Sequence, residues 1–403
     1  MGATMDRQEL RSRIEGHLQV LAGGIGARPP GSPANQRATE HVRTAFVDAG
    51  LTVREYPFKT RWWEPGEGRL TGEGFDVAVT PNPYSLPCEV EGVVLHVGSL
   101  EGLAAKDLPA GRVLVLHDEL VRQPLVPRAF PFLDAPQHRR ILAALQAARP
   151  LAVITVSDDG EPILEDPDLP LPSATVTSAT AAELPEGELV RLWLGGLIRS
   201  GSGVTLATRT PGRGPRALVS AHLDSKATTP GAFDNASGIA VLLALAEWLP
   251  ATIRPIELVA FNGEDHFDAC GEQAWLAETD LAEIAVDVNI DGVGWAGRPT
   301  TLAPLACPAE LEAQLQRFAL RHATWDKAPA WYAGDHAIFA AQGIPAIAVT
   351  SAGSRQLVGS VVHGPGDTID RLDLDILAEV VMVVRELLLD LDRQGPLAHL
   401  QLT

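Results

Sequence analysis

The chain is predicted to fold as an α/β protein, with a mostly parallel central sheet flanked by helices and a smaller β-rich domain inserted into it. After Gly201, short apolar runs alternate with stretches of helical periodicity, the order that gives a parallel sheet covered on both faces. Between about residues 72 and 194, short strand-like runs dominate, and a structureless loop of that length is improbable. The predicted parts are therefore 1–72, 73–195 and 196–403, the first and third forming one domain.

The composition argues against several classes of protein. A formal charge of −19 argues against a nucleic-acid partner, since phosphates require basic patches. No run of about 18 uncharged apolar residues is present, so no membrane span is expected. The start lacks the basic-then-apolar order of a signal peptide. Three cysteines, widely spaced and odd in number, indicate neither a disulfide framework nor a zinc motif. A cytoplasmic location is expected.

The N-terminal segment is predicted to form two helices and a strand. An amphipathic pattern over residues 5–22 predicts a helix that ends at Gly23 and Gly24. Ser32 is expected to cap a second helix over residues 33–48, because proline follows it at the first helical position. Imperfect alternation over residues 51–58 predicts a strand.

The inserted segment is predicted to be rich in β-structure. One helix is expected, over residues 138–148. Strands are expected at 93–97, 113–116, 151–156 and 173–176. Its histidines are more typical of strand or surface residues than of metal ligands.

The C-terminal part alternates predicted strands with predicted helices. Strands are expected at 217–221, 256–261, 284–290 and 344–350, with a shorter run near 301–302. Helices are expected from 236 onward and at 270–277, 308–322, 335–341 and 372–392.

Polar side chains collect just past the ends of these strands, where ligands bind in open α/β sheets. In order along the chain they are His222, Asp224, Asp234, Glu264, Asp265, Asp291, His363 and Asp367. Any one of them alone has an ordinary explanation, such as a polar cap, a solvated loop pair or an Asp-Gly turn. Their convergence on one sheet edge is harder to explain, because crowded carboxylates repel unless a cation lies between them.

Histidine and carboxylate are the ligand types of zinc and related divalent ions. Two histidines with three carboxylates suit a pair of ions that share one bridging carboxylate. Two such ions about 3.5–4 Å apart can polarise a carbonyl and lower the pKa of a shared water molecule.

The motifs HLDS, GAFDNASG, NGED, NIDGVG and HGPGDT, in this order, resemble the M28 family of zinc aminopeptidases. The resemblance covers roughly residues 216–370 and the N-terminal helices. It implies a zinc-exopeptidase (phosphorylase/hydrolase-like) fold with two divalent metal ions. By this resemblance, His222 and Asp291 would hold one ion, and Asp265 and His363 the other. Asp234 would bridge the two.

The same resemblance implies roles for three further features. Glu264 would be the general base that moves a proton from water to the leaving amine. Asp224 would hydrogen-bond His222 and fix its tautomer. The Asp234–Asn235 peptide bond would be cis. The implied activity is removal of N-terminal residues from peptides with a free N-terminus, in which Asp291 and Glu264 could hold the amine.

The chain departs from the family pattern at two positions. The family usually has glutamate where Asp265 stands, so manganese or cobalt could compete with the expected zinc. Some members have tyrosine where Val362 stands, as an oxyanion donor. His336 is the candidate replacement, with an equal alternative as a helix-start residue satisfied by Asp335.

The insert resembles a protease-associated (PA) domain, on the helix before PLAVITV and on PSATVTS before TAAEL. Such inserts often border an active-site entrance. The pocket aromatics are open: Trp62, Trp63, Trp331 and Tyr332 are as consistent with core positions.

Alternative functions also stay open. One is a glutaminyl cyclase-like transferase, which has the same fold and a single zinc. Others are a carboxypeptidase or amidase, and a non-catalytic binding module. The oligomeric state is open as well, with a homodimer as one option.

Overall fold

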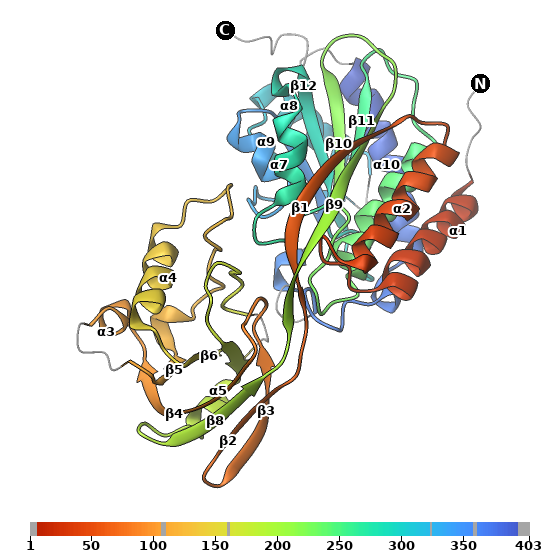
Figure 1. The fold of residues 1–403 in the computed structure, drawn as a ribbon. Helices are drawn as coiled ribbons and strands as arrows, with labels where there is room; N and C mark the ends of the chain where they lie inside the picture. The colour runs from red at the N-terminus through yellow and green to blue at the C-terminus, as the bar shows by residue number, and fades with distance from the viewer. Residues whose placement is uncertain (1–5, 106–109, 159–161, 323–324, 358–360, 394–403) are drawn as a thin grey trace. The chain divides into compact units, whose positions relative to one another are not determined.

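The computed structural model describes residues 6–105, 110–158, 162–322, 325–357 and 361–393. It divides into two compact units, one made of residues 1–60 and 202–403 and the other of residues 61–201 (Figure 1). The chain therefore leaves the first unit once and returns to it once. None of the described helices combines the length and the apolar content that crossing a bilayer requires.

The first unit is built on a mixed sheet. Its hydrogen-bonded order is β1 (Val53–Glu64), β9 (Leu197–Arg209), β11 (Ile256–Phe261), β10 (Arg216–His222), β12 (Ile284–Ile290), β15 (Ala346–Ser351), β13 (Thr300–Leu305) and β14 (Trp325–Lys327). Strands β11, β10, β12 and β15 are parallel, whereas β9 and β13 run antiparallel to their inner neighbours. The predicted α/β class is confirmed, and the parallel strands form the centre of a mixed sheet.

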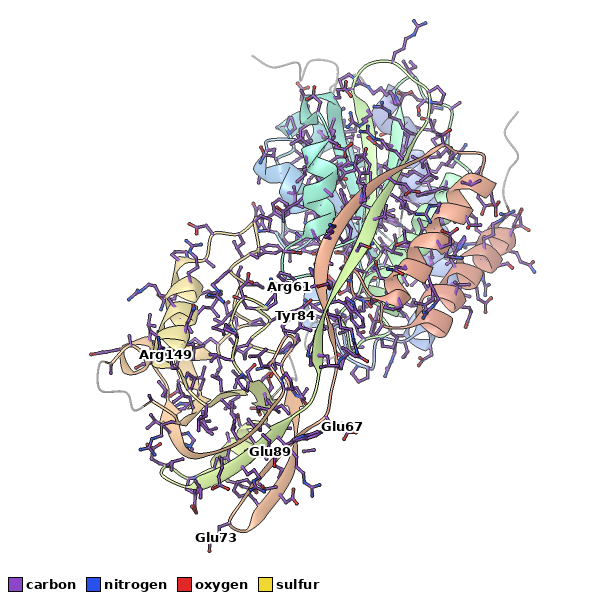
Figure 2. All side chains as sticks on the ribbon, in the orientation of Figure 1. Arg61, Glu67, Glu73, Tyr84, Glu89 and Arg149 are labelled. Atoms are coloured by element: carbon purple, nitrogen blue, oxygen red, sulfur yellow. The ribbon has the colours of Figure 1, made fainter. Side chains whose placement is uncertain are left out.

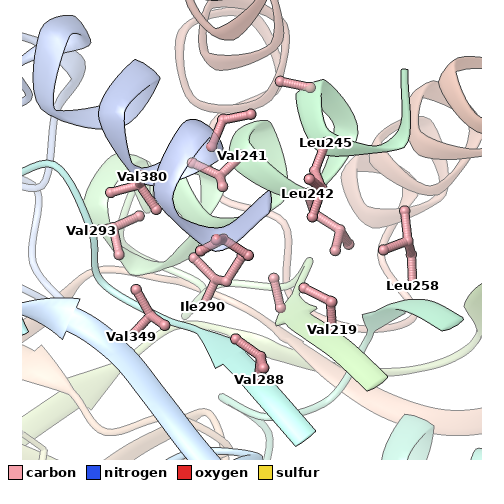
Figure 3. Packing of buried hydrophobic residues seen from close by; sticks show 14 of the residues in the cluster. Val219, Val241, Leu242, Leu245, Leu258, Val288, Ile290, Val293, Val349 and Val380 are labelled. Atoms are coloured by element: carbon pink, nitrogen blue, oxygen red, sulfur yellow. The ribbon is translucent and has the colours of Figure 1, made fainter. Parts of the chain in front are cut away.

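Five of the described helices pack against one face of this sheet, here called the first face, because alternate strand residues present apolar side chains there. The helices are α1 (Arg7–Leu18), α2 (Pro33–Asp48), α6 (Ser237–Ala246), α8 (Ala309–Ala319) and α10 (Leu374–Arg393). Figure 3 shows Val219, Val288 and Val349 of the strands beneath Val241 and Leu242 of α6. All these side chains are fully buried, and each contributes roughly 1.5–3 kcal/mol through the hydrophobic effect.

The intervening strand residues point to the second face. There Leu218 and Val259 pack with Trp275 of α7 (Cys270–Ala277) and Phe339 of α9 (His336–Ala341). The rings of Trp275 and Phe339 meet edge to face, with centroids 5.9 Å apart. Burial on both faces explains why the central strands are continuous apolar runs in the sequence.

The helix starts and stops of the N-terminal segment follow their signals in part. Ser32 caps α2 as predicted, its side chain accepting a hydrogen bond from the Asn35 amide. The prediction that the first helix ends at Gly23 and Gly24 is wrong. Residues Gln19–Ile25 continue α1 as a wider π-helical turn, which Gly26 ends with a φ of +73°. Met5, the expected start, lies outside the described residues.

The second unit is a closed barrel with the strand order β2 (Gly68–Gly72), β3 (Phe75–Pro81), β7 (Ser173–Val176), β6 (Ala152–Val156), β5 (Val113–Leu116), β4 (Cys88–Val97) and β8 (Leu189–Leu194). It also carries α3 (Leu100–Leu103), α4 (Pro136–Ala148) and α5 (Ser178–Ala182). Glu73 lies at the tip of the β2–β3 hairpin (Figure 2). The sequence does not predict strands β2, β3 and β8. A charged residue interrupts the apolar residues of each: Arg69 in β2, Asp76 in β3 and Arg191 in β8.

One buried carboxyl in the sheet should make stability depend on pH. Asp287, in the middle of β12, is fully buried and accepts a hydrogen bond from the Ser220 hydroxyl at 2.9 Å. Burial raises the pKa of Asp287 to about 8. The unfolded chain ionises near pH 4, so between about pH 4 and pH 8 rising pH favours unfolding.

We therefore expect Asp287→Asn to gain stability relative to the wild type as pH rises. The gain should increase by about 2–5 kcal/mol from pH 5 to pH 8, since the amide cannot ionise. Urea unfolding at the two pH values measures it, with the exposed Asp48→Asn as the matched control. A difference between Asp287→Asn and the wild type that stays constant with pH would contradict the expectation.

Candidate metal centre

The site lies where the parallel strands end. His222 is the last residue of β10, and Asp291 directly follows the last residue of β12. Glu264 and Asp265 follow β11, in the loop before α7. Because β10, β11 and β12 are parallel neighbours, these residues share one edge of the sheet.

Five of the predicted residues form two groups that share Asp234. In one group, Nε2 of His222 lies 2.9 Å from Oδ1 of Asp234 and 3.5 Å from Oδ1 of Asp291. In the other, Nε2 of His363 lies 3.2 Å from Oδ2 of Asp234 and 3.2 Å from Oδ1 of Asp265. The donor atoms of each group lie within 4.8 Å of one another. The two oxygens of Asp234 therefore face different groups.

Glu264 lies close to the same residues. Its Oε2 is 4.0 Å from Nε2 of His222, and together with Asp265 the two also form a compact set of donor atoms. Burial, with the nearby charges of Asp265, Asp291 and Asp234, raises the pKa of Glu264 to about 8, although His222 opposes the shift. A carboxylate with a raised proton affinity is the kind of group that can accept a proton near neutral pH.

The electrostatics of the two groups favour a bound cation. Burial alone would lower the pKa of His222, but its carboxylate neighbours outweigh burial and raise it well above the usual value. Burial alone would raise the pKa of Asp234, yet His222 and His363 lower it. In this arrangement protonated histidines balance the negative charge of the carboxylates. A divalent ion would supply that positive charge instead.

One buried atom supports the same conclusion. Among the described residues, Oδ2 of Asp265 has no hydrogen-bond partner, although the residue is only 8% exposed. A buried carboxylate oxygen without a partner is costly, and coordination to a metal would satisfy it. The residue types and their grouping thus fit two divalent ions.

A cavity of about 260 Å³ opens beside these residues. Its charged wall consists of Asp234, Glu264, Asp265, Asp291 and His363. Its remaining wall is largely apolar, formed by Phe233, Gly292, Trp331, Ala333, Thr350, Ser354 and Val362. Of the aromatics considered from sequence, Trp331 lines this cavity, whereas Trp63 is buried at 2% exposure.

Two buried aspartates hold the backbone of the loops that carry the candidate ligands. Asp224 accepts hydrogen bonds from the amides of Gly263 and Asp265, at 2.8 and 3.1 Å. Its Oδ1 lies 3.6 Å from Nδ1 of His222, longer than a normal hydrogen bond. Asp367 accepts hydrogen bonds from the amides of Phe233 and Asp234, at 2.7 and 3.1 Å. The expected cis peptide bond between Asp234 and Asn235 is confirmed.

Arg28 is a residue that the sequence did not single out. Its guanidinium is fully buried and donates to the carbonyls of Leu223, Pro230 and Gly231, at 2.6, 2.7 and 2.9 Å. These carbonyls belong to the loop that leads from His222 to Asp234. Burial lowers the pKa of Arg28 to about 10, so the group stays cationic at neutral pH. Lys226 adds a second cation, with Nζ 4.0 Å from Oδ1 of Asp265.

His336 lies outside the cavity wall. It is fully buried, with Nε2 3.0 Å from the carbonyl of Trp331 and Nδ1 3.3 Å from Oδ1 of Asn289. Burial lowers its pKa to about 4, so the ring is neutral. Nε2 is engaged by a carbonyl, and the ring is not part of the cavity wall, whereas Glu264 is.

Comparison with known sequences supports the same reading of the first unit. Residues 204–388 match the model of Peptidase family M28. The chain is 26% identical to the probable lipoprotein aminopeptidase LpqL of Mycobacterium tuberculosis, over 68% of this chain and 56% of that protein. A vacuolar membrane protease of Clavispora lusitaniae is 36% identical over 21% of this chain and 8% of that protein. The chain thus spans only part of the length of these relatives.

Solved structures share the fold over nearly the whole chain. The aminopeptidase from Aneurinibacillus sp. strain AM-1 superposes with a TM-score of 0.76 at 20% identity, covering 98% of this chain and 95% of that one. The zinc aminopeptidase BSAP from Bacillus subtilis gives 0.70 at 18% identity, covering 95% and 94%. At these identities the similarity concerns the fold. The family model spans the sheet from β9 onward together with its polar edge, and this part of the chain is similar to peptidase family M28.

Proposed function

We propose that this protein is a metal-dependent aminopeptidase that removes N-terminal residues from peptides. The observation that carries the proposal is the pair of ligand groups sharing Asp234 beside one cavity. His222 and Asp291 would hold one divalent ion, Asp265 and His363 the other, and Asp234 both. Zinc is the expected ion, with manganese and cobalt as alternatives because Asp265 provides a shorter oxygen ligand than glutamate.

The side chains around the cavity divide the work of hydrolysis. When bound, the two ions would polarise the scissile carbonyl and lower the pKa of a water molecule. Glu264 would take the proton from that water and return it to the leaving amine. The carboxylates of Asp291 and Glu264 line the cavity and would hold the cationic N-terminus of the substrate.

The apolar wall of the cavity supports a preference for apolar N-terminal residues. Phe233 and Val362 are buried together with Leu357 in one cluster, and both reach the cavity. A leucine or phenylalanine side chain would bury its surface there, whereas a charged side chain would lose hydration without a partner.

We also propose that the barrel of residues 61–201 is a PA-like domain. The parallel run of β4, β5, β6 and β7, with α4 before β6, supports this proposal.

Chelation and metal return test the proposed activity. We expect hydrolysis of leucyl-p-nitroanilide to be lost on dialysis against a chelator and to return fully with two equivalents of zinc. Glutamyl- and lysyl-p-nitroanilide should react more slowly than the leucyl compound. N-acetyl-leucyl-p-nitroanilide should not react, because its amine carries no charge.

Other results would contradict the proposal. Full activity at one equivalent, with cyclisation of N-terminal glutamine instead of hydrolysis, would favour the glutaminyl cyclase alternative. Cleavage of the acetylated substrate at an equal rate would favour an amidase.

A further inference from the structure

A second group of side chains of metal-ligand type directly follows Asp265 along the chain and takes no part in the proposed reaction. His266, Asp268 and Cys270 follow Asp265 along the chain, two residues apart from one another. One donor atom of each lies within 4.8 Å of the other two. The imidazole, the carboxylate and the thiol are the three ligand types that zinc takes from proteins.

The turn before α7 brings the three side chains together. Ala269 has a φ of +45°, in the left-handed region, and its amide donates to the His266 carbonyl at 3.3 Å. This turn directs Cys270 back toward the imidazole. His266 and Cys270 are only 4% and 7% exposed. The local backbone therefore holds together two buried donors, His266 and Cys270, and the partly exposed Asp268.

Two contacts within the group meet at one ring nitrogen. Nδ1 of His266 lies 2.8 Å from Oδ1 of Asp268 and 3.9 Å from Sγ of Cys270. A cysteine nucleophile activated by histidine uses the two ring nitrogens for different partners. Here both partners approach the same nitrogen, so the group is not arranged as a proton relay.

The state of the thiol also argues against a nucleophile. Burial, reinforced by the nearby Asp268 and Glu272, raises the pKa of Cys270 far above its usual value. A thiol of this kind is inert unless a cation stabilises its thiolate. A metal ion is the agent that deprotonates such a ligand outright.

The separations suit a tetrahedral ion. Zinc bonds of about 2.0–2.3 Å place neighbouring nitrogen and oxygen ligands about 3.4 Å apart, and nitrogen and sulfur about 3.6 Å apart. The observed 2.8 and 3.9 Å differ from these values by 0.6 Å or less, within reach of small side-chain rotations. One carboxylate and one thiolate would also neutralise the charge of a divalent ion, which lowers the cost of burying it.

We propose that Nδ1 of His266, a carboxylate oxygen of Asp268 and Sγ of Cys270 bind one zinc-like divalent ion, separate from the pair at Asp234. Binding transfers the thiol proton of Cys270 to solvent and forms one metal–sulfur bond. Because His266 directly follows Asp265, the ion would brace the loop that carries Glu264 and Asp265.

Cobalt spectroscopy tests this site independently of catalysis. The proposed pair of ions has only nitrogen and oxygen ligands, so a thiolate–cobalt charge-transfer band in the near ultraviolet reports the new site alone. We expect the metal-free protein, titrated with Co²⁺, to bind three equivalents and to develop this band. Cys270→Ser should bind two equivalents and lack the band. Cys307→Ser is the matched control, since its thiol contacts a backbone carbonyl instead, and it should keep the band.

A second variant keeps the test possible if Cys270→Ser does not fold. The Asp268 side chain is 22% exposed, so Asp268→Asn should fold and weaken the Co²⁺ affinity of the sulfur-containing site by at least about tenfold. Two equivalents of Co²⁺ with peptidase activity and no sulfur band in the wild type would overturn the inference and leave the proposed function standing. A sulfur band that remains in Cys270→Ser would also overturn the inference. A band in a protein without peptidase activity would support this site and count against the proposed function.

Discussion

Glu264→Gln should lower kcat for leucyl-p-nitroanilide by about 10²–10⁴-fold, since that is the usual loss when a general base is removed. The amide keeps the shape of the side chain but cannot accept the proton of the attacking water. KM should change far less, because Asp291 and the apolar wall would also contribute to substrate binding. Both zinc equivalents should remain bound, since Glu264 is not a proposed ligand.

Metal analysis and steady-state kinetics on the same preparation separate the outcomes. The exposed Glu278→Gln is the matched control and should retain wild-type kcat. If Glu264→Gln keeps kcat within about threefold while holding two zinc ions, another group must accept the proton. If it loses a zinc ion, Glu264 is a ligand, as its 4.0 Å separation from His222 would allow.

Arg28→Met should destabilise the first unit by about 3–5 kcal/mol, the range observed when one partner of a buried charged network is removed. The change leaves the carbonyls of Leu223, Pro230 and Gly231 without their donor. It also removes a cation that interacts with the buried Asp224 and Asp367. The stability of Arg28→Lys should fall between those of the wild type and Arg28→Met, because an ammonium keeps the charge but cannot reach all these carbonyls.

Urea unfolding of the metal-free protein measures the effect without any contribution from bound ions. Arg37→Met, an exposed arginine on α2, is the matched control and should stay within about 0.5 kcal/mol of the wild type. A loss below about 1 kcal/mol for Arg28→Met would show that water replaces the guanidinium without difficulty. The stabilising role expected for Arg28 would then be wrong.

The contrast between Glu264 and Arg28 shows what sequence patterns can predict. Glu264 follows an apolar run that is buried on both faces, and β11 was therefore located to the residue, as were α7 and β12. Parallel strands end at one edge, so the meeting of His222, Asp265 and Asp291 followed from their order. Arg28 lies in a loop nearly 200 residues before the carbonyls it binds, and no local period encodes that contact.

Other shortfalls have equally local causes. Two glycines predicted a helix end after residue 22, but glycine tolerates a widened turn, and the helix runs on to Ile25. Strand β9 was missed because Gly201 and Gly203 interrupt its apolar residues. His336 stands in a short polar motif that a cavity wall and a buried core use alike. Only the packing around Trp331 distinguishes the two.

The connection between the two units has a consequence for how such chains vary. The excursion into residues 61–201 begins within β1 and returns within β9, and these strands are hydrogen-bonded neighbours at the border of the sheet. The strands that lead to the candidate ligands lie inward of that border, from β11 onward. A domain inserted at this point can therefore be lengthened, exchanged or lost while the order of the strands that lead to the candidate ligands is preserved.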